Sequence, residues 1–256
     1  MNVEEFKSSN GHDVEGYWLP RVTSITGIIS KPGLFRYYAM HRNFYSAQES
    51  MNSAAAWGNL VHTAVENTLK GKGDIDSRVQ ASVDGFLKWK EKNNVKILSV
   101  SDVEKSVYDL DDNYSGTVDA VLEIDGRIGI LDIKTGASIW DEYSLQLAAY
   151  MNAYNKFVPK KRQANTRWIL RIDQFDECEH CKAQRRIKSG RITAGDKMCP
   201  HHFSETKAKL QFKELKDYNR DIEGFLSAKR LWEWSNRKLL NEVENYPKNK
   251  NPQTLF

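Results

Sequence analysis

Hydrophobic and polar residues follow different spacings along this chain, and the spacing predicts its secondary structure. Residues 17–29 alternate loosely and are rich in β-forming side chains, which favours a strand. Apolar residues at intervals of three or four predict helices over residues 34–46, 53–70, 75–93, 139–155 and 218–244. The chain is therefore expected to combine helices with a sheet.

Short β segments around a Ser/Asp-rich interruption are predicted over residues 97–108, and strands are predicted over residues 114–124, 127–134, 168–172 and 208–215, with the last two as partners. Asp125-Gly126, between the second and third of these segments, is a strong signal for a tight hairpin. Apolar side chains fall on both faces of this hairpin, with Val118 expected on the face of Leu122. Helices should therefore cover the sheet on both sides.

Length and composition are those of a globular protein. The 256 residues are 40% hydrophobic and 28% charged, and a single domain over residues 1–256 is favoured over two. A formal net charge of +4 permits a polyanionic partner without requiring one. No stretch is apolar enough to span a membrane, and the first residues resemble neither a signal nor a transit peptide. We therefore expect a cytoplasmic protein, in the host cytoplasm if the source is viral, with a solvated tail over residues 247–252.

The predicted hairpin brings two acidic residues and a lysine together. Counting outward from Asp125-Gly126 places Asp119 opposite Asp132, where two like charges are destabilising unless a cation neutralises them. Lys134 shares a sheet face with Asp132, because alternate residues of a strand point the same way. Metal-assisted hydrolysis of phosphodiesters uses such a set, with Mg²⁺ or Mn²⁺ as the metal. A solvated ladder of salt bridges is the alternative interpretation.

Two further pairs of polar residues have helical spacing. His62 and Glu66 lie one turn apart, with Gly58 a turn earlier. Gln146 and Tyr150 repeat that spacing after the lysine. Taken alone, each pair is more often part of a helix surface or of the edge of a core than of a functional site.

Four motifs in this order resemble those of the PD-(D/E)XK nuclease superfamily, and most closely its RecB-like exonuclease branch. The motifs are Gly58-x-x-x-His62-x-x-x-Glu66, Gly116-Thr117-Val118-Asp119, Asp132-Ile133-Lys134-Thr135 and Gln146-x-x-x-Tyr150. The resemblance spans about residues 20–172. It implies an α/β fold with a restriction-endonuclease-like core, in which a mixed central sheet is flanked by helices.

The resemblance also implies roles for individual residues. The metal ligands would be His62, Asp119, Asp132 and the carbonyl of Ile133, with Glu66 as a ligand whose role varies among relatives. Lys134 would be the catalytic lysine, and Gln146 and Tyr150 would contact DNA or brace that lysine. Several relatives hold an iron–sulfur cluster on four cysteines, one of them before the motifs. This chain has three cysteines, all after the motifs, so no cluster of that pattern is expected.

The cysteines form a motif of their own. Cys178, Cys181, Cys199 and His202 follow the spacing C-x₂-C-x₁₇-C-x₂-H, which is typical of zinc ribbons and fingers. His202 is expected as the fourth ligand in preference to His201, because it repeats the two-residue spacing of the first pair. The sequence thus predicts a structural Zn²⁺ in a zinc-knuckle insertion over residues 174–206.

Basic and aromatic residues in two segments are candidates for DNA binding. Arg185 and Arg186 belong to a basic run between the zinc ligands, which can lie on phosphates. Tyr37, Tyr38 and Arg42 belong to a segment whose rings and cations suit the stacking of unpaired bases. The alternative for this second segment is an ordinary helix with its aromatic side chains in the core.

The sequence therefore predicts a metal-dependent deoxyribonuclease. An exonuclease that prefers single strands and acts in recombination, repair or replication is favoured. Its expected partners are DNA that is single-stranded or has a free end, and a helicase, recombinase or annealing protein; a membrane is not expected. Two alternatives remain open. One is an endonuclease of a CRISPR-adaptation or restriction system, and the other is a non-catalytic, zinc-containing nucleic-acid-binding module.

Overall fold

The hairpin at the centre of the sheet forms where the sequence predicts it. The computed structural model describes residues 1–247, so the predicted tail lies outside the described residues apart from Pro247. The two strands are β5 (Tyr114–Ile124) and β6 (Arg127–Lys134). Asp125 and Gly126 have φ of 50° and 76°, as the central residues of a type I′ turn require. This turn sets the pairing from Ile124↔Arg127 outward to Ala120↔Leu131.

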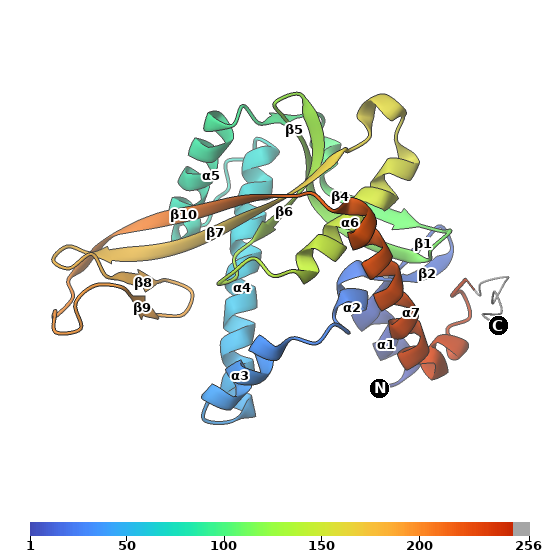
Figure 1. Cartoon of the computed structure of the whole chain (residues 1–256), viewed down its shortest axis with the longest axis horizontal. Coiled ribbons are helices and arrows are strands. Elements are labelled where there is room, and N and C mark those ends of the chain that lie inside the picture. Colours follow the sequence, from blue (N-terminus) through green and yellow to red (C-terminus); the bar gives the residue numbers. More distant parts are fainter. Residues whose placement is uncertain (248–256) are drawn as a thin grey trace.

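The sheet around this hairpin is mixed, and the fold is α/β (Figure 1). On one side, β3 (Lys96–Ile97) and β4 (Val103–Asp109) pair antiparallel with β5. On the other side, β7 (Thr166–Cys178) runs parallel to β6 and antiparallel to β10 (Phe203–Leu215). The predicted partnership of residues 168–172 with 208–215 is confirmed by pairs such as Ile172↔Leu210.

The strands β7 and β10 continue beyond the body of the sheet as an arm, residues 173–209, which extends to the left in Figure 1. Within the arm, β8 (Gln184–Arg186) pairs with residues 175–177 of β7, and β9 (Ile192–Thr193) pairs with β8. The pairing of β6 with β7 ends at Lys134↔Arg171. The arm therefore extends the sheet just past the end of the strand that carries the candidate lysine.

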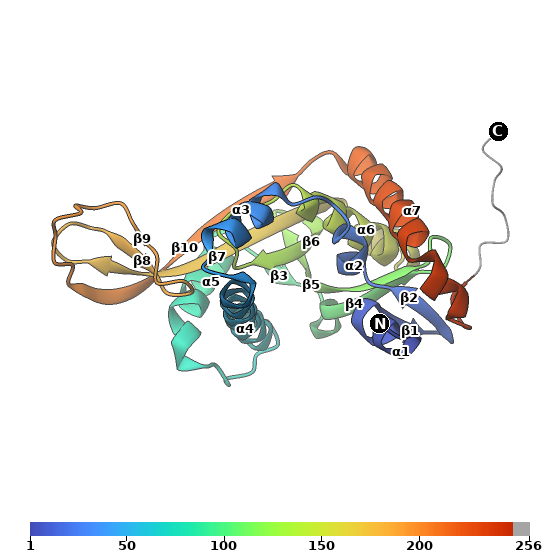
Figure 2. The same cartoon turned by 90° about the horizontal axis from the view of Figure 1, so that it is seen from below.

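Helices cover both faces of the sheet (Figure 2). On one face, α4 (Phe44–Leu69) and α5 (Gln80–Lys92) pack on side chains such as Leu131. On the other, α6 (Glu142–Phe157) and α7 (Tyr218–Glu242) pack on side chains such as Ile130. The two apolar faces of the hairpin are thus both buried.

No helix within the described residues combines the length and the apolar character that a membrane crossing needs.

The N-terminal part departs from the expected pattern in two places. It contains α1 (Val3–Asn10), β1 (Gly11–Val14), β2 (Tyr17–Pro20), α2 (Val22–Thr26) and α3 (Pro32–Met40). The predicted strand over residues 17–29 is therefore wrong after Pro20, because α2 begins at Val22. The helix predicted from Ser53 begins earlier, at Phe44, because Asn43 and Ser46 form a capping box there. The helix predicted over residues 34–46 therefore ends early, at Met40, and residues 44–46 belong to α4.

Three short 3₁₀ turns lie between the longer elements of residues 1–247. They are η1 (Ser77–Val79), η2 (Val100–Asp102) and η3 (Lys160–Arg162). The first delays the start of α5 to Gln80, later than the predicted start at residue 75. The second is the Ser/Asp-rich interruption expected within residues 97–108, and it separates β3 from β4.

Candidate active site and metal centre

Asp119 lies where the regular alternation of β5 is interrupted. Val118 packs with Val121 and Ile130 on the side of α6, and not on the face of Leu122 as expected. The ladder with β6 ends at Ala120↔Leu131, so Asp119 and Asp132 are not a ladder pair. Instead, the Asp119 Oδ2 accepts a 2.6 Å hydrogen bond from the backbone N–H of Ile133. The predicted neighbourhood of the two acids thus arises through the backbone of β6.

Asp119 also contacts the helix on its own side of the sheet. The Nδ1 of His62, on α4, lies 3.4 Å from the Asp119 Oδ2. The structure thereby brings together the first and second of the four sequence motifs. Burial opposes the protonation of His62, but the hydrogen bond and charge of Asp119 outweigh it and raise the pKa of the imidazole.

Asp132 and Lys134 meet two residues of α6 on the opposite face of the sheet. The Lys134 Nζ lies 2.8 Å from the Asp132 Oδ2 and donates hydrogen bonds to the Asp132 Oδ1 and, at 3.3 Å, to the Gln146 Oε1. The Gln146 Nε2 donates to the Asp132 Oδ1 and to the Tyr150 Oη. The third and fourth motifs therefore form one hydrogen-bonded group.

The electrostatics of this group separate the two acids. Burial raises the pKa of Asp132 to about 6, against the opposing charge of Lys134. Burial would raise the pKa of Asp119 as well, but His62, Lys134 and the Ile133 N–H together lower it. Burial would lower the pKa of Lys134, yet the two carboxylates raise it. Lys134 is thus held as an ammonium beside Asp119, which ionises readily, and Asp132, which ionises less readily.

The donor set suits a hard divalent cation that also accepts an imidazole. The Asp132 Oδ2 is buried and takes no well-directed hydrogen bond within residues 1–247, although the Lys134 ammonium lies beside it. This oxygen is therefore available to a metal. The ligand atoms of His62, Asp119 and Asp132 do not all lie within 4.8 Å of one another, since none of the three belongs to such a group among the described residues. Binding a cation between them requires the side chains to close on it.

Glu66 and Glu104 complete the acidic surroundings. The Glu66 Oε1 is engaged by the Lys70 Nζ at 2.6 Å, so its carboxylate is turned to an ion pair on α4. Glu104 was not singled out from the sequence. It lies opposite Asp119, between the β4–β5 pairs Val103↔Ala120 and Lys105↔Val118, with a φ of 53°. Partial burial and the charges of Asp119 and Glu66 raise its pKa. Glu104 can be found from the sequence by counting outward from the turn between β4 and β5, in the way that counting from Asp125-Gly126 places Asp119 opposite Asp132.

Two glycines of the motifs allow close approach to the site. A Cβ at Gly116 would lie 2.4 Å from the Tyr150 Cε1, so only glycine lets the ring of Tyr150 rest on β5. A Cβ at Gly58 would lie 3.1 Å from the Thr135 Oγ1. This glycine brings α4 against the residue that follows Lys134.

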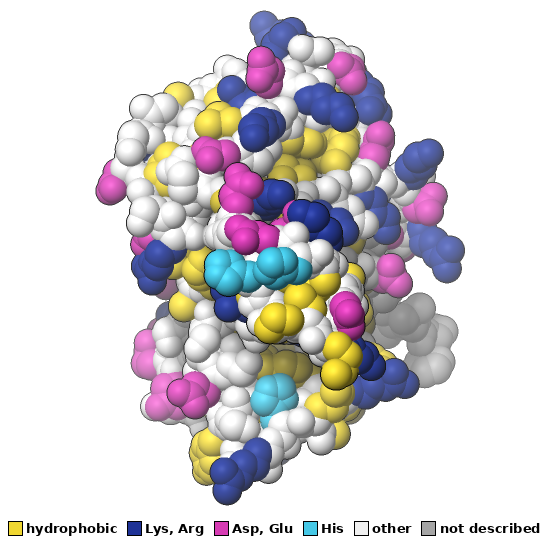
Figure 3. Space-filling view, turned by 90° about the vertical axis from the view of Figure 1, so that its left-hand side faces the viewer, with side chains coloured by type: hydrophobic (Ala, Val, Ile, Leu, Met, Phe, Trp, Pro, Cys, Tyr) yellow, Lys and Arg dark blue, Asp and Glu magenta, His cyan; other side chains and the backbone are white. Residues whose placement is uncertain are grey.

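The arm holds a second candidate metal centre. Cys178, Cys181, Cys199 and His201 place their ligand atoms within 4.8 Å of one another. Three thiols and an imidazole in this arrangement can hold a metal ion such as zinc. Figure 3, which faces the end of the arm, shows histidine side chains there with lysine and arginine side chains beside them.

The fourth member of this cluster is His201, so the prediction of His202 is wrong. His201 has a φ of 42°, and its Nδ1 lies 3.3 Å from the Cys181 Sγ. His202 is 74% exposed and its Nδ1 lies 3.4 Å from Glu179. The backbone N–H of Cys181 lowers the pKa of Cys178 to about 5, against burial, and His201 adds to this effect. Cys178 is thus readily a thiolate, the form that binds metal.

Two cations of the arm and Arg171 of β7 hold the loop that follows Lys134. The Arg186 Nη2 donates to the Thr135 carbonyl at 2.9 Å, and the Lys188 Nζ donates to the Thr135 Oγ1 at 3.1 Å. The Arg171 Nε donates to the carbonyl of Gly136 at 2.8 Å. The arm and the candidate catalytic strand therefore share one hydrogen-bonded junction.

The other predicted DNA-binding residues differ in exposure. Arg185 is 44% exposed and pairs with Asp176 at 2.7 Å. No residue of α3 is buried, so Tyr37 and Tyr38 are surface residues and not core residues. The ring of Tyr38 stacks on Phe44 at 5.4 Å. Arg42 is exposed, and no ion pair within residues 1–247 engages it.

Tyr37 is connected to the site through a pocket. This pocket is lined by Tyr37, Trp140 and Tyr143, among other residues, and the Lys134 Nζ lies 4.7 Å from the centre of the Tyr143 ring. The aromatic surface of α3 thus leads to the candidate lysine.

Comparison with models of protein families finds no match for this sequence, and a search of curated proteins finds no match either.

Proposed function

We propose that this chain is a PD-(D/E)XK nuclease of the RecB-like kind, which hydrolyses DNA phosphodiesters with Mg²⁺ or Mn²⁺. One observation carries the proposal. Asp132 and Lys134 are joined to Gln146 by hydrogen bonds at the end of β6, while Asp119 bonds the intervening residue of the same strand. These residues come from β5, β6 and α6, and His62 on α4 joins them through Asp119, so residues of all four motifs lie close together in the fold.

The side chains suggest a division of labour. His62, Asp119 and Asp132 would hold the metal, which when bound supplies a water of lowered pKa and neutralises charge on the phosphate. The Lys134 ammonium, held by Asp132 and Gln146, would orient the attacking water or donate to a non-bridging phosphate oxygen. Gln146 fixes both neighbours, and Tyr150 supports Gln146 from the next turn of α6.

An exonuclease that prefers single strands is supported by the aromatic surface. Tyr37, Trp140 and Tyr143 line one pocket beside Lys134, and base stacking on such rings contributes about 1–3 kcal/mol per base. Duplex DNA keeps its bases stacked inside and makes no use of this surface. The Cys178, Cys181, Cys199 and His201 cluster would hold a structural Zn²⁺ that stabilises the arm.

The test uses end-labelled single-stranded and duplex DNA with Mg²⁺, Mn²⁺ or EDTA, with Asp132→Asn as the control for contaminating nucleases. We expect metal-dependent release of short products, faster from single strands, by the wild type only. Binding without cleavage under every metal condition would favour the non-catalytic module instead.

A further inference from the structure

A pocket of about 450 Å³ lies between the arm and the loop after β6, and its lining is strongly basic. Four cations line it: Arg171, Arg186, Arg191 and Lys209. Asp173 is the one acidic residue in the lining. The pocket therefore carries an excess of positive charge that a polyanion can neutralise.

The two inner guanidiniums are held in place. The Arg171 Nη2 and the Arg186 Nε each lie 2.6 Å from a different oxygen of Asp173, and both residues also donate to the loop after Lys134. A guanidinium has five N–H donors, and the hydrogen bonds given for residues 1–247 use two in each. The remaining donors are oriented in advance for a ligand with several oxygens.

The two outer cations are free for a ligand. Arg191 and Lys209 are both exposed, and neither side chain forms an ion pair in the part of the chain that the structure describes. Asp173 is already shared between two arginines. No acid in the lining therefore compensates the charge of these two residues.

The pocket continues the sheet face that carries the candidate active site. Lys134 and Arg171 are neighbours in the parallel pair of β6 and β7. Asp173 is the next residue of β7 on that face, and Lys209 lies opposite it on β10. Arg171 itself lines the pocket, and neighbouring strands lie about 4.8 Å apart, so the pocket begins on the strand directly beside the lysine.

We propose that this pocket binds phosphodiester groups of the nucleic-acid strand whose scissile bond lies at Asp132 and Lys134. The proposal rests on the proposed function for the position of the scissile bond. The arm would thus hold the strand by its backbone, without reading its sequence, while the loop after Lys134 is held by the same arginines.

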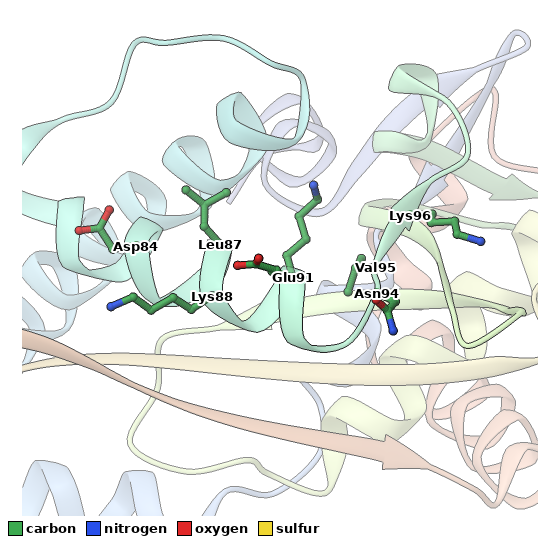
Figure 4. A pocket seen from close by; sticks show the side chains of 8 residues that line it. Asp84, Leu87, Lys88, Glu91, Asn94, Val95 and Lys96 are labelled. Atoms are coloured by element: carbon green, nitrogen blue, oxygen red, sulfur yellow. The ribbon is translucent and has the colours of Figure 1, made fainter.

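The experiment measures binding, without catalysis. A fluorescein-labelled oligothymidylate is titrated with the full-length chain in EDTA at several salt concentrations, using the wild type and Arg191→Ala/Lys209→Ala. The control is Lys88→Ala/Lys92→Ala, which removes two exposed cations from α5, the helix that packs on the other face of the sheet. Figure 4 labels Lys88 on this helix, beside a separate pocket. Arg191→Lys keeps the charge at the pocket.

We expect the pocket variant to bind about tenfold more weakly or worse at physiological salt, with a salt slope reduced by about 1.4 for two lost phosphate contacts. The α5 control and Arg191→Lys should bind like the wild type. An unchanged slope in the pocket variant, or an equal loss in the α5 control, would overturn the proposal. So would polyglutamate binding with the same dependence on Arg191 and Lys209, because the pocket would then take acidic peptides.

The outcome is separable from that of the proposed function. A chain that binds through the pocket but cleaves no DNA with any metal would keep the pocket and disprove the nuclease. A chain that cleaves DNA but binds it independently of Arg191 and Lys209 would disprove the pocket alone.

Discussion

The Lys188 Nζ donates a hydrogen bond to the Thr135 Oγ1 over 3.1 Å and lies 3.3 Å from the carbonyl oxygen of the same residue. Lys188 belongs to the arm that holds the cysteine cluster, and Thr135 directly follows the candidate catalytic lysine. The two candidate metal centres are therefore linked through a single junction, although they belong to different parts of the fold.

This junction leads to the first prediction. Lys188→Met keeps the apolar stem but removes the donor to Thr135, so the loop after Lys134 loses one of its three cationic contacts. We expect kcat for DNA cleavage to fall about tenfold, with KM little changed. The control is Lys182→Met, an arm lysine that is 70% exposed and pairs with Glu177. Equal effects of both changes would show that the contact with Thr135 is irrelevant to the reaction.

The acids of the site give the second prediction. Asp119→Asn and Asp132→Asn should each lower cleavage by at least about a thousandfold, because the residues act as one metal-binding unit. The amide has the size of the carboxylate, so thermal unfolding should remain cooperative. Cleavage rates and melting curves are measured on the same preparations. Near wild-type activity in Asp132→Asn would exclude the proposed catalytic role.

The raised pKa of Asp132 gives the third prediction, for the metal-free protein. Its pKa is about 6 in the folded chain against an ordinary value of 3.8, so between these values the folded state holds a proton that the unfolded state has released. The contribution of this carboxyl to the free energy of unfolding therefore falls as the pH rises from about 4 to about 6. Urea unfolding in EDTA should show this fall as a difference between the wild type and Asp132→Asn. Parallel profiles for the two proteins would contradict the assignment.

The cysteine cluster gives the fourth prediction. Protein purified without chelator should contain about one Zn²⁺ per chain, measured by elemental analysis. His201→Ala and Cys181→Ser should lose the metal and loosen the arm. His202→Ala is the matched control and should keep it, because its side chain lies outside the cluster. Loss of zinc in His202→Ala with retention in His201→Ala would restore the ligand set expected from spacing alone.

The fifth prediction concerns the DNA end. If the strand is fed past Tyr37 and Trp140 to the metal site, linear single strands should be digested and closed circles of the same sequence should persist. A time course on both substrates, with blunt linear duplex alongside, decides between the candidates. Equally fast cutting of circles would favour the endonuclease. Faster digestion of the duplex would remove the stacking role from Tyr37 and Tyr38.

The sequence by itself determined the features that depend on neighbouring residues. The register of β5 and β6 follows from Asp125 and Gly126, because a two-residue turn leaves the flanking strands one way to pair. The spacing of Cys178, Cys181 and Cys199 likewise indicated a metal-binding cluster, since ligands on short loops converge with little help from the rest of the chain.

Only the tertiary structure decided the features that depend on distant or irregular backbone. The choice of His201 over His202 rests on a left-handed residue, which spacing does not reveal. The side chains of β5 stop alternating regularly between the two sheet faces at Asp119, and Glu104 lies opposite this residue. Both features arise where β4, β5 and β6 meet. The contact of Lys188 with Thr135 joins residues 53 positions apart. Such contacts form only when separate elements pack, because their energies depend on the whole fold and not on any local pattern of residues.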